Sequence, residues 1–250
     1  GEGSSCTTFS LKQGNQIVFG KNYDWHLGRG LVMVNKRGVS KTAMPGLRGD
    51  PGEYAQWTSK YGSLTFNQYG REMPMGGMNE TGLVVETMYL KKSRYPSRDE
   101  RQVLHTFQWV QYQLDNAATI TEVIESDHAV RIRPNDSGTG HHYLVADSSG
   151  DCAVVEFIDG RMVHYRGNQL PVRALTNSLY RKSLAYWEKD RSPFFDRYNS
   201  IKRFNHTASM LSRYEGHRSI APVDYAFNIL TYISNPGFTV WSIVYDINNR

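Results

Sequence analysis

The sequence predicts an α+β protein built on large antiparallel sheets, and three observations lead to this class. The first hundred of its 250 residues carry mostly strand-type alternation of apolar and polar side chains. Helical periodicity begins only after that and returns once more near the other end. No glycine-rich phosphate loop follows a strand, as a nucleotide-binding fold would require. Runs of strands separated by pairs of helices favour layered α+β architecture.

The chain opens with a predicted β-hairpin. Strand-like segments 6–11 and 16–25 flank KQGN, a short turn that contains glycine. The same alternation continues beyond the hairpin, where GGMNETG is predicted to be a tight turn that feeds a strand. The further strand-like segments of this half are 31–38, 54–68 and 83–90.

The spacing of apolar side chains changes from a strand pattern to a helix pattern at residue 97. Ser97 is predicted to cap a helix over 98–116, in which four apolar side chains share one face. Thr121 is predicted to cap a second, shorter helix within 120–130. The four apolar side chains are Val103, Phe107, Val110 and Leu114.

Strands resume in the second half, and a second pair of helices precedes a final strand. The predicted strands are 141–147, 152–160, 161–167, 173–178 and 237–247, and the predicted helices are 197–214 and 222–233.

The composition describes an ordered globular chain. Hydrophobic residues make up 39% and aromatic residues 12%, and no apolar run is long enough to cross a bilayer. The 29 basic residues are interleaved with 24 acidic ones, and no nucleic-acid-binding signature accompanies them, so neither nucleic acid nor a membrane is expected as a partner. We expect residues 6–250 to form a single domain and residues 1–5 to be a leader or propeptide remnant. The small residues Gly3 and Ser5 suit a processing site, which favours an exported protein over a cytoplasmic one.

Only two cysteines occur, and they differ in setting. Cys152 lies in the strand pattern DCAVVEF and is predicted to be buried and inert. Cys6 is either a small buried hydrophobe or a nucleophile that becomes an N-terminus. A cysteine at a free N-terminus carries its own base, because an α-amine with a pKa near ~8 can take the thiol proton. No partner histidine is then needed, and no metal or other cofactor is expected, since the ligand clusters are missing from the sequence.

Six motifs occur in a fixed order along the chain. They are Cys6-Thr7-Thr8, FGKNYDW (19–25), GGMNETGL (76–83), HYLVAD (142–147), LTNS (175–178) and SIKRF (200–204). With them the sequence resembles the choloylglycine hydrolase family of N-terminal nucleophile enzymes, which includes penicillin V acylases and conjugated bile salt hydrolases. The resemblance implies a four-layer αββα fold, in which two antiparallel sheets are stacked and Cys6 lies at the end of a central strand.

The resemblance also implies roles for the residues of the first hairpin. Cys6 matches the nucleophile, and Asp24 matches the carboxylate that holds the amine and thiol of the nucleophile in position. Lys21 stands where the family usually has arginine. Lysine keeps the positive charge but loses the planar, bidentate fork of a guanidinium.

Three more residues match the family's site. Asn177 matches the side-chain donor of the oxyanion hole, although alone it would be an asparagine that caps a helix. The backbone N–H of Tyr89 matches the second donor and its ring a pocket wall, although alone it would be a half-buried strand tyrosine. Arg203 matches the arginine that pairs with the site carboxylate, although alone it would be an ordinary helix-surface charge.

The implied activity is hydrolysis of a linear, non-peptide C–N amide bond through a thioester of Cys6. The expected substrate is a small-molecule amide with a penicillin V-like or other acyl group, with conjugated bile salts as a second class. Two alternatives are an acyltransferase on the same scaffold and a binding protein whose catalysis has decayed. A homo-oligomer, either a dimer or a tetramer, is compatible with the resemblance.

Overall fold

The computed structural model describes residues 5–46, 52–134, 137–190, 195–214 and 219–250. Of the leader predicted over residues 1–5, the first four lie outside the described residues. The described chain contains no helix that is long and apolar enough to cross a membrane.

A four-stranded antiparallel sheet forms around the first hairpin, which the sequence predicted. The hairpin pairs in register from Thr7 opposite Asn22 to Gln13 opposite Gln16. A strand from the far end of the sequence joins its second arm, so residues more than 200 positions apart become neighbours. The strand order is β14 (Ala174–Leu175), β1 (Thr7–Gln13), β2 (Gln16–Asp24), β15 (Thr239–Asp246).

The second large sheet has seven strands, and all neighbours in it are antiparallel. Two smaller sheets have two strands each: β4 (Ser40–Thr42) pairs with β5 (Gln56–Thr58), and β9 (Gln102–Leu104) with β10 (Val130–Ile132). The strand order of the large sheet is β13 (Arg161–Arg166), β12 (Cys152–Ile158), β11 (His141–Ala146), β8 (Val84–Tyr89), β7 (Pro74–Asn79), β6 (Ser63–Asn67), β3 (Leu31–Asn35).

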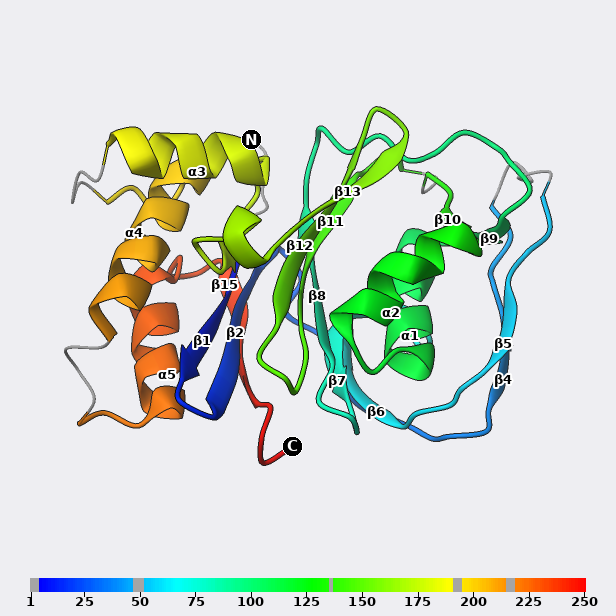
Figure 1. Ribbon diagram of the computed structural model, residues 1–250, viewed down its shortest axis with the longest axis horizontal. Coiled ribbons are helices and arrows are strands. Elements are labelled where there is room, and N and C mark those ends of the chain that lie inside the picture. The colour runs from blue at the N-terminus through cyan, green and yellow to red at the C-terminus, as the bar shows by residue number, and fades with distance from the viewer. Residues whose placement is uncertain (1–4, 47–51, 135–136, 191–194, 215–218) are drawn as a thin grey trace.

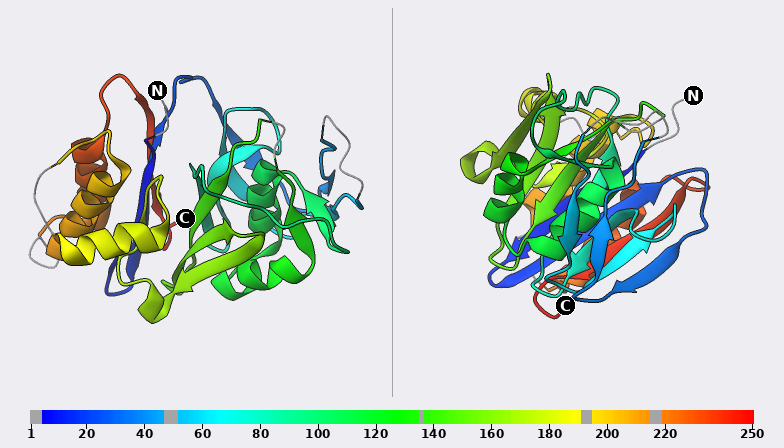
Figure 2. Two further views of the ribbon diagram at one scale, coloured as in Figure 1. Left: turned by 90° about the horizontal axis from the view of Figure 1, so that it is seen from above. Right: turned by 90° about the vertical axis from the view of Figure 1, so that its right-hand side faces the viewer.

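Helices cover the outer face of each large sheet, which gives four layers (Figures 1 and 2). The helices between residues 106 and 125 lie on the side of the seven-stranded sheet, and those between residues 180 and 233 lie on the side of the four-stranded sheet (Figure 1). The predicted αββα architecture is confirmed. The helices are α1 (Thr106–Asn116), α2 (Ile120–Glu125), α3 (Tyr180–Lys189), α4 (Ser200–Arg213) and α5 (Pro222–Ile233), and two short 3-10 turns are η1 (Ser126–His128) and η2 (Gly167–Gln169).

Two apolar cores follow from the alternation of side chains along the strands. In β8, Val84 and Met88 join the core that reaches the four-stranded sheet, together with Phe19. Val85 points to the other face and joins the core beneath α1, together with Trp109. Both faces of β8 are therefore buried, and the neighbouring strands β11 and β12 likewise contribute side chains to both cores.

The helix predicted over 98–116 is too long at its beginning. Gln102–Leu104 form β9, which pairs in parallel with β10, and α1 starts only after His105, whose ring accepts a hydrogen bond from the backbone N–H of Phe107. Val103, predicted on the helix face, is instead a buried strand residue. Pairing with β10 makes this segment a strand. The local pattern could not show this, because β10 lies about 28 residues further along the chain.

The first two glycines of GGMNETG were also assigned wrongly to a turn, whereas Gly82 does lie in the turn, with a φ of +89°. Gly76 and Gly77 lie within β7, and the turn itself begins at Asn79. A Cβ at Gly76 would lie 2.2 Å from the carboxyl carbon of Glu86, and one at Gly77 would lie 2.5 Å from the carbonyl oxygen of Leu64. These glycines therefore permit close packing in a strand rather than a change of chain direction.

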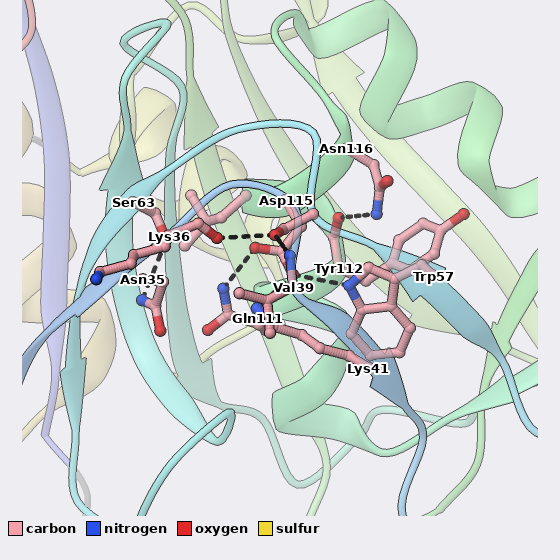
Figure 3. A network of polar contacts seen from close by, with 12 residues as sticks. Asn35, Lys36, Val39, Lys41, Trp57, Ser63, Gln111, Tyr112, Asp115 and Asn116 are labelled. Carbon is pink, nitrogen blue, oxygen red and sulfur yellow. Dashed lines mark hydrogen bonds and ion pairs between the residues drawn. The ribbon is translucent and has the colours of Figure 1, made fainter.

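A buried ion pair fastens the small β4–β5 sheet to α1 (Figure 3). The Lys41 ammonium lies 2.7 Å from Oδ2 of Asp115, and Trp57 Nε1 donates to the same oxygen at 2.7 Å. Gln111 donates to the other oxygen at 2.9 Å. These donors to the Asp115 carboxylate are all buried. The network therefore holds the β4–β5 sheet against α1, the helix whose first turn approaches the candidate site.

Candidate active site

Cys6 lies at the open end of the first hairpin, directly before β1. The hairpin register carries it alongside Tyr23 and Asp24, and its Sγ lies 3.9 Å from the backbone oxygen of Asp24. Only 2% of the residue is exposed. The 18-residue separation of Cys6 and Asp24 is therefore closed by strand pairing alone, as the sequence predicted.

Asp24 is buried at the end of β2, and its side chain is held from the last strand of the protein. Thr239 Oγ1 donates to Oδ1 of Asp24 at 2.7 Å. Burial raises the pKa of Asp24 to about 6, while the hydrogen bond from Thr239 and the charges of Arg203 and Lys21 act in the opposite direction. The carboxyl group is therefore one that changes its protonation in mildly acidic solution.

Arg203 reaches the site from α4 and is almost completely buried. Its guanidinium donates to Thr7 Oγ1 at 3.3 Å, to the backbone oxygen of Arg197 at 2.8 Å and to Oδ1 of Asn177 at 2.8 Å. These three partners are neutral oxygens, so the interaction with Asp24 acts through space instead of through the direct pairing that the resemblance implied. Burial lowers the pKa of Arg203 to about 10, and the charges of Asp24 and Cys6 oppose that shift.

Asn177 connects this arginine to the opposite sheet. Its Oδ1 accepts from Arg203, which can only donate, so the orientation of the amide group is determined. Its Nδ2 then donates one hydrogen to the backbone oxygen of Tyr89 at 3.0 Å. The second hydrogen of Nδ2 is not needed for that bond.

The backbone of Tyr89 faces the same side as Asn177. Tyr89 lies opposite His141, next to a pair in which Leu90 N–H donates to the Gly140 oxygen. Bonded and non-bonded pairs alternate in an antiparallel ladder, so the N–H and C=O of Tyr89 point away from β11. On that side, β7 pairs with β8 only as far as Glu86. The N–H of Tyr89 thus points in the direction from which Asn177 approaches.

Lys21 makes its described contacts with β8 of the facing sheet. Its ammonium donates to the backbone oxygen of Thr87 at 2.5 Å and lies 3.3 Å from Met88 Sδ. It lies 3.4 Å from Oε2 of Glu86, whose other oxygen accepts from Tyr245 at 2.5 Å. Burial raises the pKa of Glu86, and the charge of Lys21 opposes this shift. Lys21 therefore balances a buried carboxylate, and its action on the thiolate stays a prediction.

A cavity of about 490 Å³ opens beside Cys6. Its wall is mostly aromatic and thioether, with two hydroxyl side chains from the segment before β11. Phe107 and His141 were not predicted as site residues. Phe107 reaches the cavity from the first turn of α1, and His141 reaches it from β11, where it lies opposite Tyr89. The lining residues are Cys6, Tyr23, Trp25, Tyr69, Met73, Met75, Thr87, Tyr89, His105, Phe107, Ser137, Thr139 and His141.

Of the six predicted site residues, Lys21 contacts β8 at Glu86, Thr87 and Met88. The other five are linked to the cavity: Cys6 and Tyr89 line it, Asp24 contacts Cys6, and hydrogen bonds connect Arg203 to Asn177 and Asn177 to the Tyr89 backbone. They come from β2, β8, α4 and the segments before β1 and after β14. Among the described residues, no group of three or more His, Cys, Asp or Glu side chains is arranged to hold a metal ion. The chemistry that this arrangement can support is nucleophilic attack by a thiol, with donors for a developing negative charge.

Residues 6–214 match the family described as linear amide C-N hydrolases, choloylglycine hydrolase family. The chain belongs to this family.

Individual relatives agree with the family. A penicillin V acylase from Pectobacterium atrosepticum is 32% identical over 158 residues, which cover 56% of this chain and 42% of that protein. The chain thus spans less than half the length of this relative. The solved structure of a penicillin V acylase from Agrobacterium tumefaciens has a TM-score of 0.78 at 27% identity and covers 98% of this chain and 81% of that one.

A more distant structure shows the same fold. A variant of the conjugated bile acid hydrolase from Clostridium perfringens has a TM-score of 0.79 at 16% identity, and covers 97% of this chain and 86% of that one. At this identity the likeness concerns the fold alone.

Proposed function

We propose that this protein hydrolyses a linear, non-peptide amide, with Cys6 as an N-terminal nucleophile and an acyl thioester as the intermediate. The observation that carries the proposal is that Cys6 and Tyr89 line one largely apolar cavity, while Asp24 contacts Cys6 and Asn177 donates to the Tyr89 backbone. The membership of the family and the likeness to two penicillin V acylases support it.

The reaction needs Cys6 to be the first residue of the active form, because only a free α-amine can act as the base. The amine takes the thiol proton, and the thiolate attacks the carbonyl carbon of the substrate. When the tetrahedral intermediate collapses, the C–N bond breaks and the leaving amine takes the proton from the α-ammonium group. Water, deprotonated by the α-amine, then attacks the thioester and releases the acid with the thiol restored.

The surrounding residues have distinct roles in this scheme. The second hydrogen of Asn177 Nδ2 and the N–H of Tyr89 stabilise the oxyanion, at ~3 kcal/mol for each donor. In its ionised form, Asp24 orients the α-amine and the thiol of Cys6. Arg203 orients Asn177 through their hydrogen bond and contributes positive charge toward Cys6 and Asp24.

The wall of the cavity supports an aryl or similar apolar acyl group as the preferred substrate. The rings of Tyr23, Trp25, Tyr69 and Phe107 surround space that suits a flat hydrophobic group. Tyr89 also matches the tyrosine of penicillin V acylases in the resemblance. We therefore expect phenoxyacetyl amides to be cleaved faster than taurine- or glycine-conjugated bile salts.

The test is hydrolysis of a phenoxyacetyl amide by protein that begins at Cys6, with detection of the acyl-enzyme by mass spectrometry. Cys6→Ala should fold but release no acid and gain no acyl mass. Cys152→Ala is the matched control: this second cysteine is buried in β12, and burial raises its pKa to about 12. Full activity of Cys6→Ala, or of protein in which every Cys6 is still joined to Ser5, would overturn the mechanism.

A further inference from the structure

His141 stands in the wall of the cavity where β11 begins. It lies opposite Tyr89 in the ladder, so both side chains leave the same face of the seven-stranded sheet. Its ring is edge-on to Tyr89 at 6.4 Å between centroids and to Phe107 at 5.1 Å. The position is determined on the backbone as well, since His141 N–H donates to the Tyr95 hydroxyl at 2.9 Å and its carbonyl accepts from Ser93. The backbone that carries the ring is thus held in place, and the ring packs between two aromatic side chains of the wall.

The imidazole of His141 has unused hydrogen-bonding capacity. The residue is 6% exposed, and its Nδ1 is enclosed without a hydrogen-bond partner among the described residues. Burial lowers the pKa of His141 to about 3, with the nearby His142, His105 and Lys21 acting in the same direction. The ring is therefore neutral at ordinary pH and carries one N–H.

The position of that single hydrogen follows from the enclosure of Nδ1. An orphaned buried N–H is rarer than an orphaned acceptor, because a donor without a partner loses its full solvation. This favours the hydrogen on Nε2, the ring nitrogen that remains to face the cavity. The apolar wall would then present a neutral N–H donor beside Tyr89.

We propose that His141 determines specificity within the acyl group, by selecting substrates that carry a neutral acceptor oxygen along an otherwise apolar acyl chain. An aryloxyacetyl group has such an ether oxygen, whereas the phenylpropanoyl group has the same shape with a methylene in its place. The inference rests on the proposed function, since it assigns the cavity to the acyl part of the substrate. It goes further by naming one side chain and one atom of the substrate.

Binding and turnover of two matched amides test the inference. N-methyl phenoxyacetamide and N-methyl 3-phenylpropanamide differ only in that the second has a methylene in place of the ether oxygen. Their binding to Cys6→Ala protein is measured by calorimetry. The wild-type side chain should favour the oxygen-containing amide by about fivefold, the value of one ordinary hydrogen bond. His141→Phe should remove that preference, and the ratio of kcat/KM for the corresponding substrates should change by the same factor in active protein.

Tyr69→Phe is the matched control, because it removes a hydroxyl from the same cavity while it keeps the ring that stacks on Phe107. It should leave the ratio as it is. Equal binding of the two amides in protein with His141 intact would overturn the inference, whether or not His141→Phe folds. A ratio moved by Tyr69→Phe and not by His141→Phe would also overturn it. Lack of turnover with normal selective binding would refute the proposed function and leave the role of His141 standing.

Discussion

The lower pH limit of activity is expected to follow the protonation of Asp24, and Thr239 is the residue that tunes it. Burial raises the pKa of Asp24 to about 6, and the hydrogen bond from Thr239 restrains this rise. If the ionised carboxylate orients the nucleophile, kcat/KM increases as the pH rises through about 6. Replacing the hydroxyl by a methyl group, in Thr239→Val, should then move this limb toward neutral pH.

The size of the displacement follows from the strength of that bond. A hydrogen bond to a charged group contributes about 1.5–3 kcal/mol, and one pKa unit corresponds to about 1.4 kcal/mol. Water that enters near the carboxylate will replace part of the lost interaction, so the lower end of the range applies. We expect the midpoint of the limb to rise by about one pH unit, to about 7.

The assay is kcat/KM against pH for a phenoxyacetyl amide, with Thr239→Ser as the control. Serine keeps the hydroxyl that donates to Asp24 and also accepts from the backbone N–H of Asn235. Thr239→Ser should therefore retain the original midpoint. An unchanged midpoint in Thr239→Val, or an equal displacement in both variants, would refute the assignment of the limb to Asp24.

The raised pKa of Asp24 also makes the stability of the folded protein depend on pH. The folded-state pKa of Asp24, about 6, lies above the ordinary value of 3.8. The folded protein therefore binds the proton more tightly, and the contribution of Asp24 to the free energy of unfolding is greatest below pH 4 and is lost as the pH rises through about 6.

The remaining predictions concern the two buried ion pairs. Lys21→Met should lower the free energy of unfolding by about 3–5 kcal/mol in urea titrations, because Glu86 is left buried without its cation, and the added change Glu86→Leu should recover most of the loss. If Lys21→Met alone were as stable as wild type, the stabilising role of the Lys21–Glu86 pair would be contradicted. Lys41→Met should cost about 3 kcal/mol, since Asp115 keeps two of its donors, and should leave the pH profile of activity unchanged. A displaced pH profile would instead mean that the ion pair between Lys41 and Asp115 influences the site.

Much of the site could be predicted because its first part is local. The turn KQGN and the alternation on either side determine the register of the hairpin, and the register alone places Cys6 beside Asp24. The positions of Asn177, Arg203 and Tyr89 could be assigned only by resemblance, since nothing local relates them. The structure joins them in one chain of hydrogen bonds from α4 to β8.

The errors share a physical cause. A helix pattern continued into Gln102–Leu104, which pairs with a distant strand instead, and the glycines of β7 serve close packing against Glu86 and Leu64. The contact of Lys21 with Glu86 was likewise not visible in the sequence, because Glu86 comes from another sheet. In each case the deciding contact is made by another strand, which the local pattern of residues does not show.

The sequence by itself determined the class of fold, the opening hairpin and the identity of the candidate nucleophile, because alternation, turn residues and ordered motifs act over short distances. Only the tertiary structure decided which charges meet and what surrounds the cavity. Lys21 balances Glu86, Arg203 orients Asn177, and His141 joins Phe107 in the wall. Such pairings depend on how two sheets and their helices stack, and stacking is determined by the burial of side chains from the whole chain at once.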